Sequence, residues 1–272
     1  MTAETPPIAL TIAGSDPSGG AGIQADLKTF AALGVYGASV ITALTAQNTK
    51  GVSGVFAIPP DFIAAEFRSV VSDLSVTAIK TGMLGDVATV EIVASLLAEV
   101  GTIPVIVDPV MVATSGDVLL KPDAIDAVRY ALIPRAALIT PNIPEASRLL
   151  DCAAAETEAD MRAQAEALMR FGCRAVLLKG GHGDGTDVVD MLFDGRTHLA
   201  FRRPRIVTSN THGTGCTLSA AIAARLATGR PLDAAVADAK DFVWEALSAG
   251  VRMQIGKGRN GPIDHNFALR KL

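Results

Sequence analysis

Short apolar runs rich in β-branched residues alternate along the chain with longer segments in which apolar residues recur every three or four positions. The short runs lie at residues 8–13, 40–44, 77–80, 105–107, 137–140 and 175–178. Runs of this kind favour strands, whereas the spacing of Ile23, Leu27 and Phe30 places three apolar side chains on one helical face. Because strands and helices alternate, we predict an α/β fold with a central, mostly parallel β-sheet flanked by helices on both faces.

Two segments depart from this alternation and predict β-hairpins. A turn at residues 48–51 leads into a β-rich run at residues 52–58, which indicates a small β-hairpin added to the main sheet. A second hairpin is expected from residues 188–193 and 197–201, with Asp194 and Gly195 in the turn.

The last third of the chain predicts two helices and a tail. Ala-rich segments at roughly residues 215–228 and 232–249 predict consecutive helices with a break at residues 229–231. The segment after Gly250 carries three further glycines, so we expect residues 251–272 to form a loose C-terminal extension. A chain of 272 residues can be filled by one large α/β core, and we predict a single domain over residues 1–272.

Composition excludes several classes of protein. Hydrophobic residues make up 49% of the chain and charged residues 19%, which supplies a core and gives no sign of disorder. A net charge of -4 offers no electrostatic reason to bind nucleic acid. No apolar segment is long enough to cross a bilayer and the start lacks a basic region, so we expect a cytoplasmic protein without membrane partners. The three cysteines and four histidines lack the spacing of a disulfide framework or of a transition-metal site.

The first predicted strand ends in a glycine-rich loop at residues 14–22, followed directly by a helix. Residues 20–25 match the dinucleotide-binding fingerprint formally, but that site also needs an acidic residue about twenty positions onward to hold the ribose. After Asp26 the next acid is Asp61, which disfavours a dehydrogenase, and the phosphate loop of the common nucleotide hydrolases is absent from the sequence. The alternative is a glycine turn that only packs a helix against its strand.

A second glycine loop, at residues 210–217, opens the first Ala-rich helix. Gly213, Thr214 and Gly215 would expose backbone N–H groups at a helix start, where the macrodipole also favours negative charge, so the loop is built like an anion hole. Cys216 would lie in the first helical turn, where we expect the thiol pKa to fall. The alternative is a simple N-cap followed by a buried cysteine. His212 by itself is interpreted as structural.

Six motifs together give a specific resemblance. They are Ala-Gly-Ser-Asp-Pro-Ser-Gly-Gly-Ala-Gly-Ile-Gln-Ala-Asp-Leu-Lys-Thr from Ala13, Ile-Thr-Ala-Leu-Thr-Ala-Gln-Asn-Thr from Ile41, Lys-Thr-Gly-Met-Leu from Lys80, Val-Asp-Pro-Val-Met from Val107, Thr-Pro-Asn-Ile-Pro-Glu from Thr140 and Leu-Lys-Gly-Gly-His from Leu178. Over about residues 8–250 the chain resembles the ribokinase superfamily, specifically its hydroxymethylpyrimidine/phosphomethylpyrimidine kinase branch. Cys216 stands where most of that superfamily carries the aspartate that acts as base, a replacement typical of this branch and of some similar pyridoxal kinases.

The resemblance implies a pyrimidine pocket at Gly14, Ala21, Asp26, Gln47 and Met83. The chemistry of two of these residues agrees: Gln47 offers both a donor and an acceptor to an aminopyrimidine edge, and Met83 supplies an adaptable apolar wall. Without the resemblance, Gln47 could equally be a strand-end amide that caps the backbone.

A departure from the family pattern lies two residues before Gln47. This chain has Thr45 at the position where the family often has valine.

The resemblance also implies a nucleotide and metal site. It assigns Asn142, Lys179 and Thr211 to ATP and Glu145 to Mg²⁺, a hard cation that keeps most of its waters, so that one carboxylate is sufficient. Asp108 would assist the metal or orient the acceptor. Taken alone, Glu145 in a first helical turn is more often a surface acid that satisfies the helix dipole, and Asp108 an ordinary loop cap.

The implied activity is ATP-dependent phosphorylation of 4-amino-5-hydroxymethyl-2-methylpyrimidine and then of its monophosphate, for thiamin biosynthesis. The catalytic residues would be Cys216 and the loop residues Gly213, Thr214 and Gly215, with Cys216 more important for the first transfer than for the second. Two alternatives stay open: a pyridoxal or pyridoxine kinase, and a non-catalytic binding protein of the same fold. The resemblance further implies a homodimer, for which the hairpin at residues 47–58 is a candidate interface.

Overall fold

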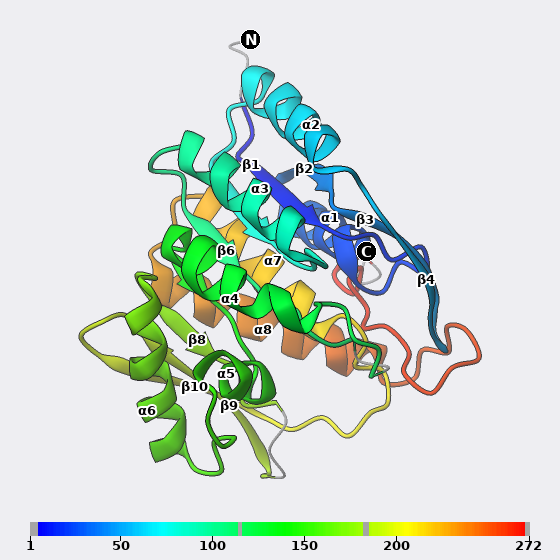
Figure 1. Cartoon of the computed structure of the whole chain (residues 1–272). Coiled ribbons are helices and arrows are strands. Elements are labelled where there is room, and N and C mark those ends of the chain that lie inside the picture. Colours follow the sequence, from blue (N-terminus) through cyan, green and yellow to red (C-terminus); the bar gives the residue numbers. More distant parts are fainter. Residues whose placement is uncertain (1–4, 114–115, 182–184, 270–272) are drawn as a thin grey trace.

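The computed structural model describes residues 5–113, 116–181 and 185–269, and Figure 1 shows a central sheet between two layers of helices. Among these residues the main sheet has eight strands in the order β10-β9-β8-β7-β6-β5-β1-β2. Strands β8, β7, β6, β5, β1 and β2 are parallel to one another. Strand β9 is antiparallel to β8, and β10 is antiparallel to β9. The predicted fold class is therefore confirmed.

The strands of the main sheet are β1 (Ile8–Ala13), β2 (Tyr36–Ile41), β5 (Ala78–Thr81), β6 (Val105–Val107), β7 (Leu138–Ile139), β8 (Val176–Leu178), β9 (Asp187–Phe193) and β10 (His198–Pro204). The α-helices are α1 (Gly22–Ala32), α2 (Pro60–Asp73), α3 (Val87–Glu99), α4 (Ile125–Ala127), α5 (Ile143–Leu150), α6 (Glu158–Leu168), α7 (Thr214–Ala227) and α8 (Leu232–Gly250). Shorter helical turns are η1 (Pro122–Ala124), η2 (Val128–Leu132), η3 (Ile133–Arg135) and η4 (Met169–Phe171).

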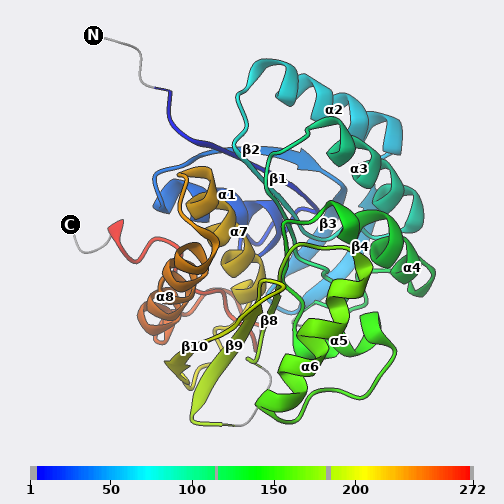
Figure 2. The same cartoon turned by 90° about the vertical axis from the view of Figure 1, so that its left-hand side faces the viewer.

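Side chains of β1 alternate between two hydrophobic cores, one on each face of the sheet. Leu10 and Ile12 pack with Phe67 of α2 in the core beneath α2, α3, α5 and α6. Ala9 lies in the opposite core with Phe30 of α1, beneath α1, α7 and α8. Figure 2 shows these two helical layers on either side of the sheet. A strand buried on both faces reads as a continuous apolar run, which is why residues 8–13 were recognisable as a strand.

Both predicted hairpins are present, but the predicted strand at residues 40–44 is wrong as a single element. Strand β2 ends at Ile41, and a separate two-stranded sheet begins with β3 (Ala43–Asn48) and β4 (Gly51–Ala57). The break falls at Thr42, whose hydroxyl donates to the Met83 carbonyl at 2.7 Å and whose amide donates to the Ala13 carbonyl at 3.1 Å. The Thr42 amide makes the last bond of the β1–β2 ladder, and its hydroxyl bonds to Met83 at the point where the chain leaves the main sheet.

Residues 251–269, the described part of the C-terminal segment, pack onto the rest of the protein, contrary to the loose extension expected over residues 251–272. Ile263 and Phe267 are buried. The Asn210 side-chain amide donates to the carbonyls of Gly250 and Met253 at 2.7 and 2.8 Å. In Figure 1 the segment, in red, passes the end of β4, where the Gly258 amide donates to the Thr49 hydroxyl at 3.0 Å.

In the part of the chain that the structure describes, none of the helices has the length and apolar character needed to span a membrane.

The order in which strands are added to the sheet reverses at β1: β2 lies on one side of it, and the later strands, starting with β5, lie on the other. In open α/β sheets, ligands bind in the crevice outside the carboxyl ends of the strands at such a switch point. Gly14, Asp108 and Lys179 each follow directly after a parallel strand, so the fold gathers them at one edge of the sheet.

Candidate active site

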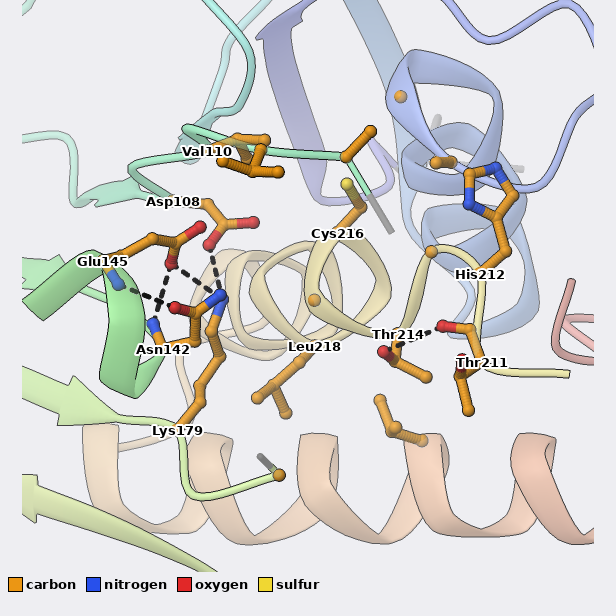
Figure 3. Close-up of a pocket in the computed structure, with 18 of the residues that line it drawn as sticks. Asp108, Val110, Asn142, Glu145, Lys179, Thr211, His212, Thr214, Cys216 and Leu218 are labelled. Carbon is orange, nitrogen blue, oxygen red and sulfur yellow. Dashed lines mark hydrogen bonds and ion pairs between the residues drawn. The ribbon is translucent and has the colours of Figure 1, made fainter. Parts of the chain in front are cut away.

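A cavity of about 680 Å³ lies at this edge, and most residues expected to be functional line it. The lining residues from the sequence predictions are Gly14, Ala21, Gln47, Met83, Asp108, Asn142, Glu145, Lys179, Thr211, Gly213, Thr214, Gly215 and Cys216. Residues that lie up to about two hundred positions apart in the sequence therefore meet in one cavity. Figure 3 shows the labelled members of this group arriving from several different elements.

The residues expected to bind the pyrimidine, Gly14, Ala21, Gln47 and Met83, all line the cavity. A Cβ atom at Gly14 would stand 3.2 Å from the Met83 sulfur, so the glycine permits the methionine to close this wall. The threonine that replaces the family's valine is accommodated, because the Thr45 hydroxyl donates to the Ser15 carbonyl at 2.8 Å.

Asp26, which the resemblance also assigned to this pocket, lies behind the cavity wall. Its carboxylate accepts from the Lys80 ammonium at 2.8 and 3.0 Å and from the Thr11 hydroxyl at 2.6 Å. The side chains of Asp26 and Lys80 are both 0% exposed. Lys80 reaches the cavity lining, so it stands between Asp26 and any ligand.

The second glycine loop has the geometry of an anion hole. Gly213 is the N-cap of α7 with φ +83°, and a Cβ atom there would collide with the Gly20 carbonyl oxygen. The Thr214 amide makes a long 3.3 Å bond to the Thr211 carbonyl, and bonding within the helix begins with the Thr217 amide. The amides of Gly215 and Cys216 precede that point, where helix N–H groups have no intrahelical partner.

The predicted fall in the thiol pKa is wrong. Burial raises the pKa of the Cys216 thiol to about 11, and the neighbouring Asp26 and Asp108 carboxylates act in the same direction against the Lys80 ammonium. Cys216 is half-buried, and the partial loss of water around its thiol outweighs the helix N-terminus because desolvation penalises the charged form directly. Cys216 is therefore a neutral thiol at pH 7 in the unliganded protein.

The opposite side of the loop faces a cluster built around Lys179. Its ammonium lies 2.8 Å from Asp108 Oδ1 and 4.0 Å from Glu145 Oε2, as Figure 3 shows. Asn142 and Glu145 form a reciprocal capping box at the start of α5, with bonds of 2.7 and 2.8 Å. The Thr140 hydroxyl donates to Asp108 at 3.0 Å, which fixes the orientation of that carboxylate.

The two carboxyl groups of the cluster differ in ionisation. Although burial alone would raise it, the ammonium groups of Lys179 and Lys80 hold the pKa of Asp108 below its usual range. Burial raises the pKa of Glu145 to about 7, because the Lys179 charge does not offset the desolvation and Asp108 adds to it. Both groups offer oxygen ligands, the kind that Mg²⁺ prefers.

Sequence reasoning missed several residues that line the cavity. Lys240 and Trp244 of α8 line it, with Lys240 2.6 Å from Asp190 and the Trp244 ring nitrogen donating to the Pro204 carbonyl at 2.9 Å. Neither residue stands in a recognisable motif. Lys80 could have been found, since a lysine within an apolar strand is almost never buried without a partner.

The class of protein now follows from the architecture. A mostly parallel sheet that ends in the antiparallel β9–β10 pair, with a glycine loop opening a helix over the carboxyl ends of its strands, is that of the ribokinase-like kinases. The structure of Bacillus subtilis pyridoxal kinase with ADP superposes with a TM-score of 0.89 at 38% identity, covering 98% of this chain and 99% of that one. Phosphomethylpyrimidine kinase from Clostridium difficile 630 has a TM-score of 0.78 at 42% identity, covering 88% and 98%.

Sequence comparison narrows the class. The family model described as phosphomethylpyrimidine kinase matches residues 16–264, and the chain belongs to this family. The hydroxymethylpyrimidine/phosphomethylpyrimidine kinase of Rhizobium meliloti (strain 1021) is 55% identical over 258 residues, which cover 95% of this chain and 96% of the relative. The enzyme of the same name from Salmonella typhimurium is 52% identical, covering 96% and 97%.

Proposed function

We propose that this protein transfers the γ-phosphoryl group of ATP to the hydroxymethyl group of 4-amino-5-hydroxymethyl-2-methylpyrimidine, and then phosphorylates the resulting monophosphate to the diphosphate. The observation that carries the proposal is one cavity whose lining includes Gln47 and Met83 together with the Gly213–Cys216 loop and Lys179. The names of relatives in thiamine biosynthesis, including a bifunctional enzyme of Arabidopsis thaliana that is 51% identical, support it.

Binding of the acceptor is assigned to Gly14, Ala21, Gln47 and Met83. The Gln47 amide presents a donor and an acceptor, which match the ring nitrogen and amino group of an aminopyrimidine. The Met83 side chain provides an apolar face for the ring. Asp26 is assigned an indirect role, because it holds the Lys80 ammonium in place at the cavity lining.

The transferring phosphoryl group is assigned to the loop at the start of α7. The amides of Gly215 and Cys216 and the Lys179 ammonium would surround its equatorial oxygens, where negative charge is spread in the transition state. Thr211 and Asn142 would contact the nucleotide from either side of this position. Phosphoryl transfer depends mainly on positioning and charge stabilisation, so these groups supply most of the catalysis.

Cys216 is proposed to accept the hydroxyl proton in the first transfer. A thiol with a pKa of about 11 is a reluctant base before ligands bind, but the loose transition state demands little deprotonation of the attacking hydroxyl. The second acceptor is a phosphate whose second pKa is about 6, so it is already ionised at neutral pH. Cys216 therefore matters more to the first transfer than to the second.

Asp108 and Glu145 fit a site for Mg²⁺. Their buried carboxyl groups lie on either side of Lys179, and together they offer the one or two carboxylates that this ion requires beside phosphate oxygens and water. The ion would neutralise charge on the phosphate chain, and its binding would remove the proton that Glu145 holds at a pKa of about 7.

The proposed function is tested by ADP release from purified protein with hydroxymethylpyrimidine, its monophosphate and pyridoxal as separate acceptors. We expect turnover with both pyrimidines and a higher kcat/KM for each than for pyridoxal. A preference for pyridoxal would make the protein a pyridoxal kinase, and absence of turnover with every acceptor would leave a binding protein.

A homodimer and a cytoplasmic location are proposed alongside this activity. Leu44 and Phe56 of the β3–β4 hairpin are cross-strand partners on one face, 46% and 66% exposed, and such a pair of exposed apolar side chains suits a subunit interface. Sedimentation of the intact protein should give twice the mass of the chain. Phe56→Lys should shift it to the monomer, and a monomer before substitution would end the proposal.

A further inference from the structure

The two glycine loops of the cavity are joined by a buried contact between Asp16 and His212. Asp16 Oδ2 lies 2.8 Å from His212 Nε2, although the two residues are 196 positions apart. Asp16 is 1% exposed and His212 7% exposed. A buried polar contact across such a separation constrains where the two loops lie relative to each other.

The Asp16 carboxylate is fully committed to this junction. Oδ1 accepts the amide and the hydroxyl of Ser18, and Oδ2 accepts the Ala21 amide at 2.8 Å as well as the His212 ring. Burial would raise its pKa, but the hydrogen bonds from His212, Ser18 and Ala21 lower it to about 2. An ionised carboxylate only accepts, so His212 Nε2 carries the hydrogen of the contact.

The loops also touch through their backbones. A Cβ atom at Gly20 would collide with the His212 ring, and one at Gly213 would collide with the Gly20 carbonyl. Asp16 therefore joins Ala21 of the first loop to His212 of the second. The two loops are already in van der Waals contact there and cannot approach more closely.

The consequence reaches the sulfur of Cys216. The Gly22 backbone, next in sequence to the amide that Asp16 holds, faces the Cys216 thiol and acts to lower its pKa. On the other loop, Cys216 follows His212 by four residues. The Asp16 carboxylate thus holds both the segment before Gly22, through Ala21, and the segment before Cys216, through His212.

We infer that Asp16 and His212 are a positioning pair that holds the Gly22 amide against Cys216 and seats the anion-hole loop beside the acceptor pocket. The inference rests on the proposed function for its kinetic consequence, but not for its geometry. Neither residue is assigned a proton-transfer step. Displacement of a reacting group by about 1 Å costs up to about 100-fold in rate, so loss of the pair should act on the chemical step.

The kinetic test compares His212→Leu and Asp16→Asn with His212→Gln, which keeps an N–H donor near the position of Nε2. We expect kcat for hydroxymethylpyrimidine to fall roughly 10- to 100-fold in the first two variants, with KM within about threefold. The Gln variant should recover most of kcat. The double variant should be no slower than either single variant, because both remove the same contact.

A matched control is His198→Leu. His198 Nε2 lies at the same 2.8 Å from a carboxylate, Glu166, but this pair is outside the cavity lining and its side chains are 19% and 58% exposed. Its removal should leave kcat unchanged.

A second readout is independent of catalysis. In protein labelled with ¹⁵N-glycine, the Gly22 amide resonance should move in Cys216→Ala, which removes the sulfur acceptor, and should move the same way in His212→Leu and Asp16→Asn. It should stay in place in His212→Gln and His198→Leu. If His212→Leu does not fold, Asp16→Asn carries the same test.

Three results would overturn the inference. One is a kcat within about twofold of the unaltered protein in both disrupting variants. Another is a raised KM at unchanged kcat, which would make His212 a direct substrate contact. The third is an unmoved Gly22 resonance. Lack of pyrimidine turnover in the unaltered protein would defeat the proposed function alone, since the resonance shifts would still test the pair.

Discussion

Breaking the buried pair of Lys80 and Asp26 should destabilise the protein far more than breaking an ion pair of equal length at the surface. Both side chains are 0% exposed, and two bonds of 2.8 and 3.0 Å join them. Removal of one partner leaves an uncompensated buried charge, for which we expect a loss of about 3–5 kcal/mol in the free energy of unfolding for Asp26→Asn or Lys80→Met.

The double variant separates the pair energy from other effects. With both charges gone, the desolvation penalty disappears as well, so Asp26→Asn with Lys80→Met should cost less than the sum of the single losses by at least about 2 kcal/mol. Glu99→Gln is the surface control, because Glu99 lies 2.9 Å from Arg68 with side chains 45% and 60% exposed. Its loss should stay within about 1 kcal/mol.

Equilibrium unfolding in urea measures these losses, and acceptor kinetics on the same variants assigns the role of Asp26. The reasoning is refuted if the single losses match that of Glu99→Gln, or if they add in the double variant. A large rise in KM for the pyrimidine in a fully stable Asp26→Asn variant would instead make Asp26 a direct ligand contact, as the family resemblance implied.

Three further predictions follow from the site. Cys216→Ala should slow the first transfer more than the second. In the unaltered protein the rate of the first transfer should rise from pH 7 to 9, since the thiolate fraction grows toward the thiol pKa of about 11. Equal losses in the two transfers, or a flat pH profile, would show that Cys216 is not the proton acceptor. Burial lowers the pKa of His265 from 6.5 to about 4, so the stability it contributes is present above pH 6.5 and is lost as pH falls toward 4. Chemical unfolding should show a loss of about 2 kcal/mol at pH 5 that His265→Gln abolishes, and an unchanged loss in that variant would contradict this. Gly213→Ala should lower the free energy of unfolding more than Gly34→Ala does, and should abolish turnover. Both glycines have positive φ, but only Gly213 abuts the Gly20 carbonyl. Equal losses in the two variants would mean that backbone strain alone determines the effect.

The sequence was sufficient for the parts of the fold that depend on local pattern. Residues 8–13 and 105–107 were predicted as strands with the bounds that the structure has, because both segments are apolar on both faces. Residues 40–44 misled because β2 ends at Ile41 and a separate hairpin begins at Ala43, a change of sheet that no periodicity reports.

Long-range packing explains the remaining errors. Glycines at 256, 258 and 261 looked like signs of a loose tail, yet Gly258 approaches Thr49 so closely that no side chain would fit there. The ionisation of Cys216 depended on burial beside three charged groups rather than on its place in a helix. The assignment of Asp26 to the pocket stays a prediction, but its pairing with Lys80, 54 positions away, could not be read from local pattern.

The cavity, by contrast, was largely predictable. Residues that follow the carboxyl ends of parallel strands must meet at one edge of the sheet, so Gly14, Asp108 and Lys179 could be brought together from the sequence. Their partners across the cavity could not, because Lys240 and Trp244 lie in a helix without a motif.

The central claim is that one cavity performs both phosphorylations of the same pyrimidine. The most direct measurement is a mass-spectrometric time course of purified protein with ATP, Mg²⁺ and hydroxymethylpyrimidine, with ADP counted in parallel. We predict that the monophosphate rises and then falls as the diphosphate forms, with two ADP produced for each diphosphate. Formation of ADP without any phosphorylated pyrimidine would contradict the account.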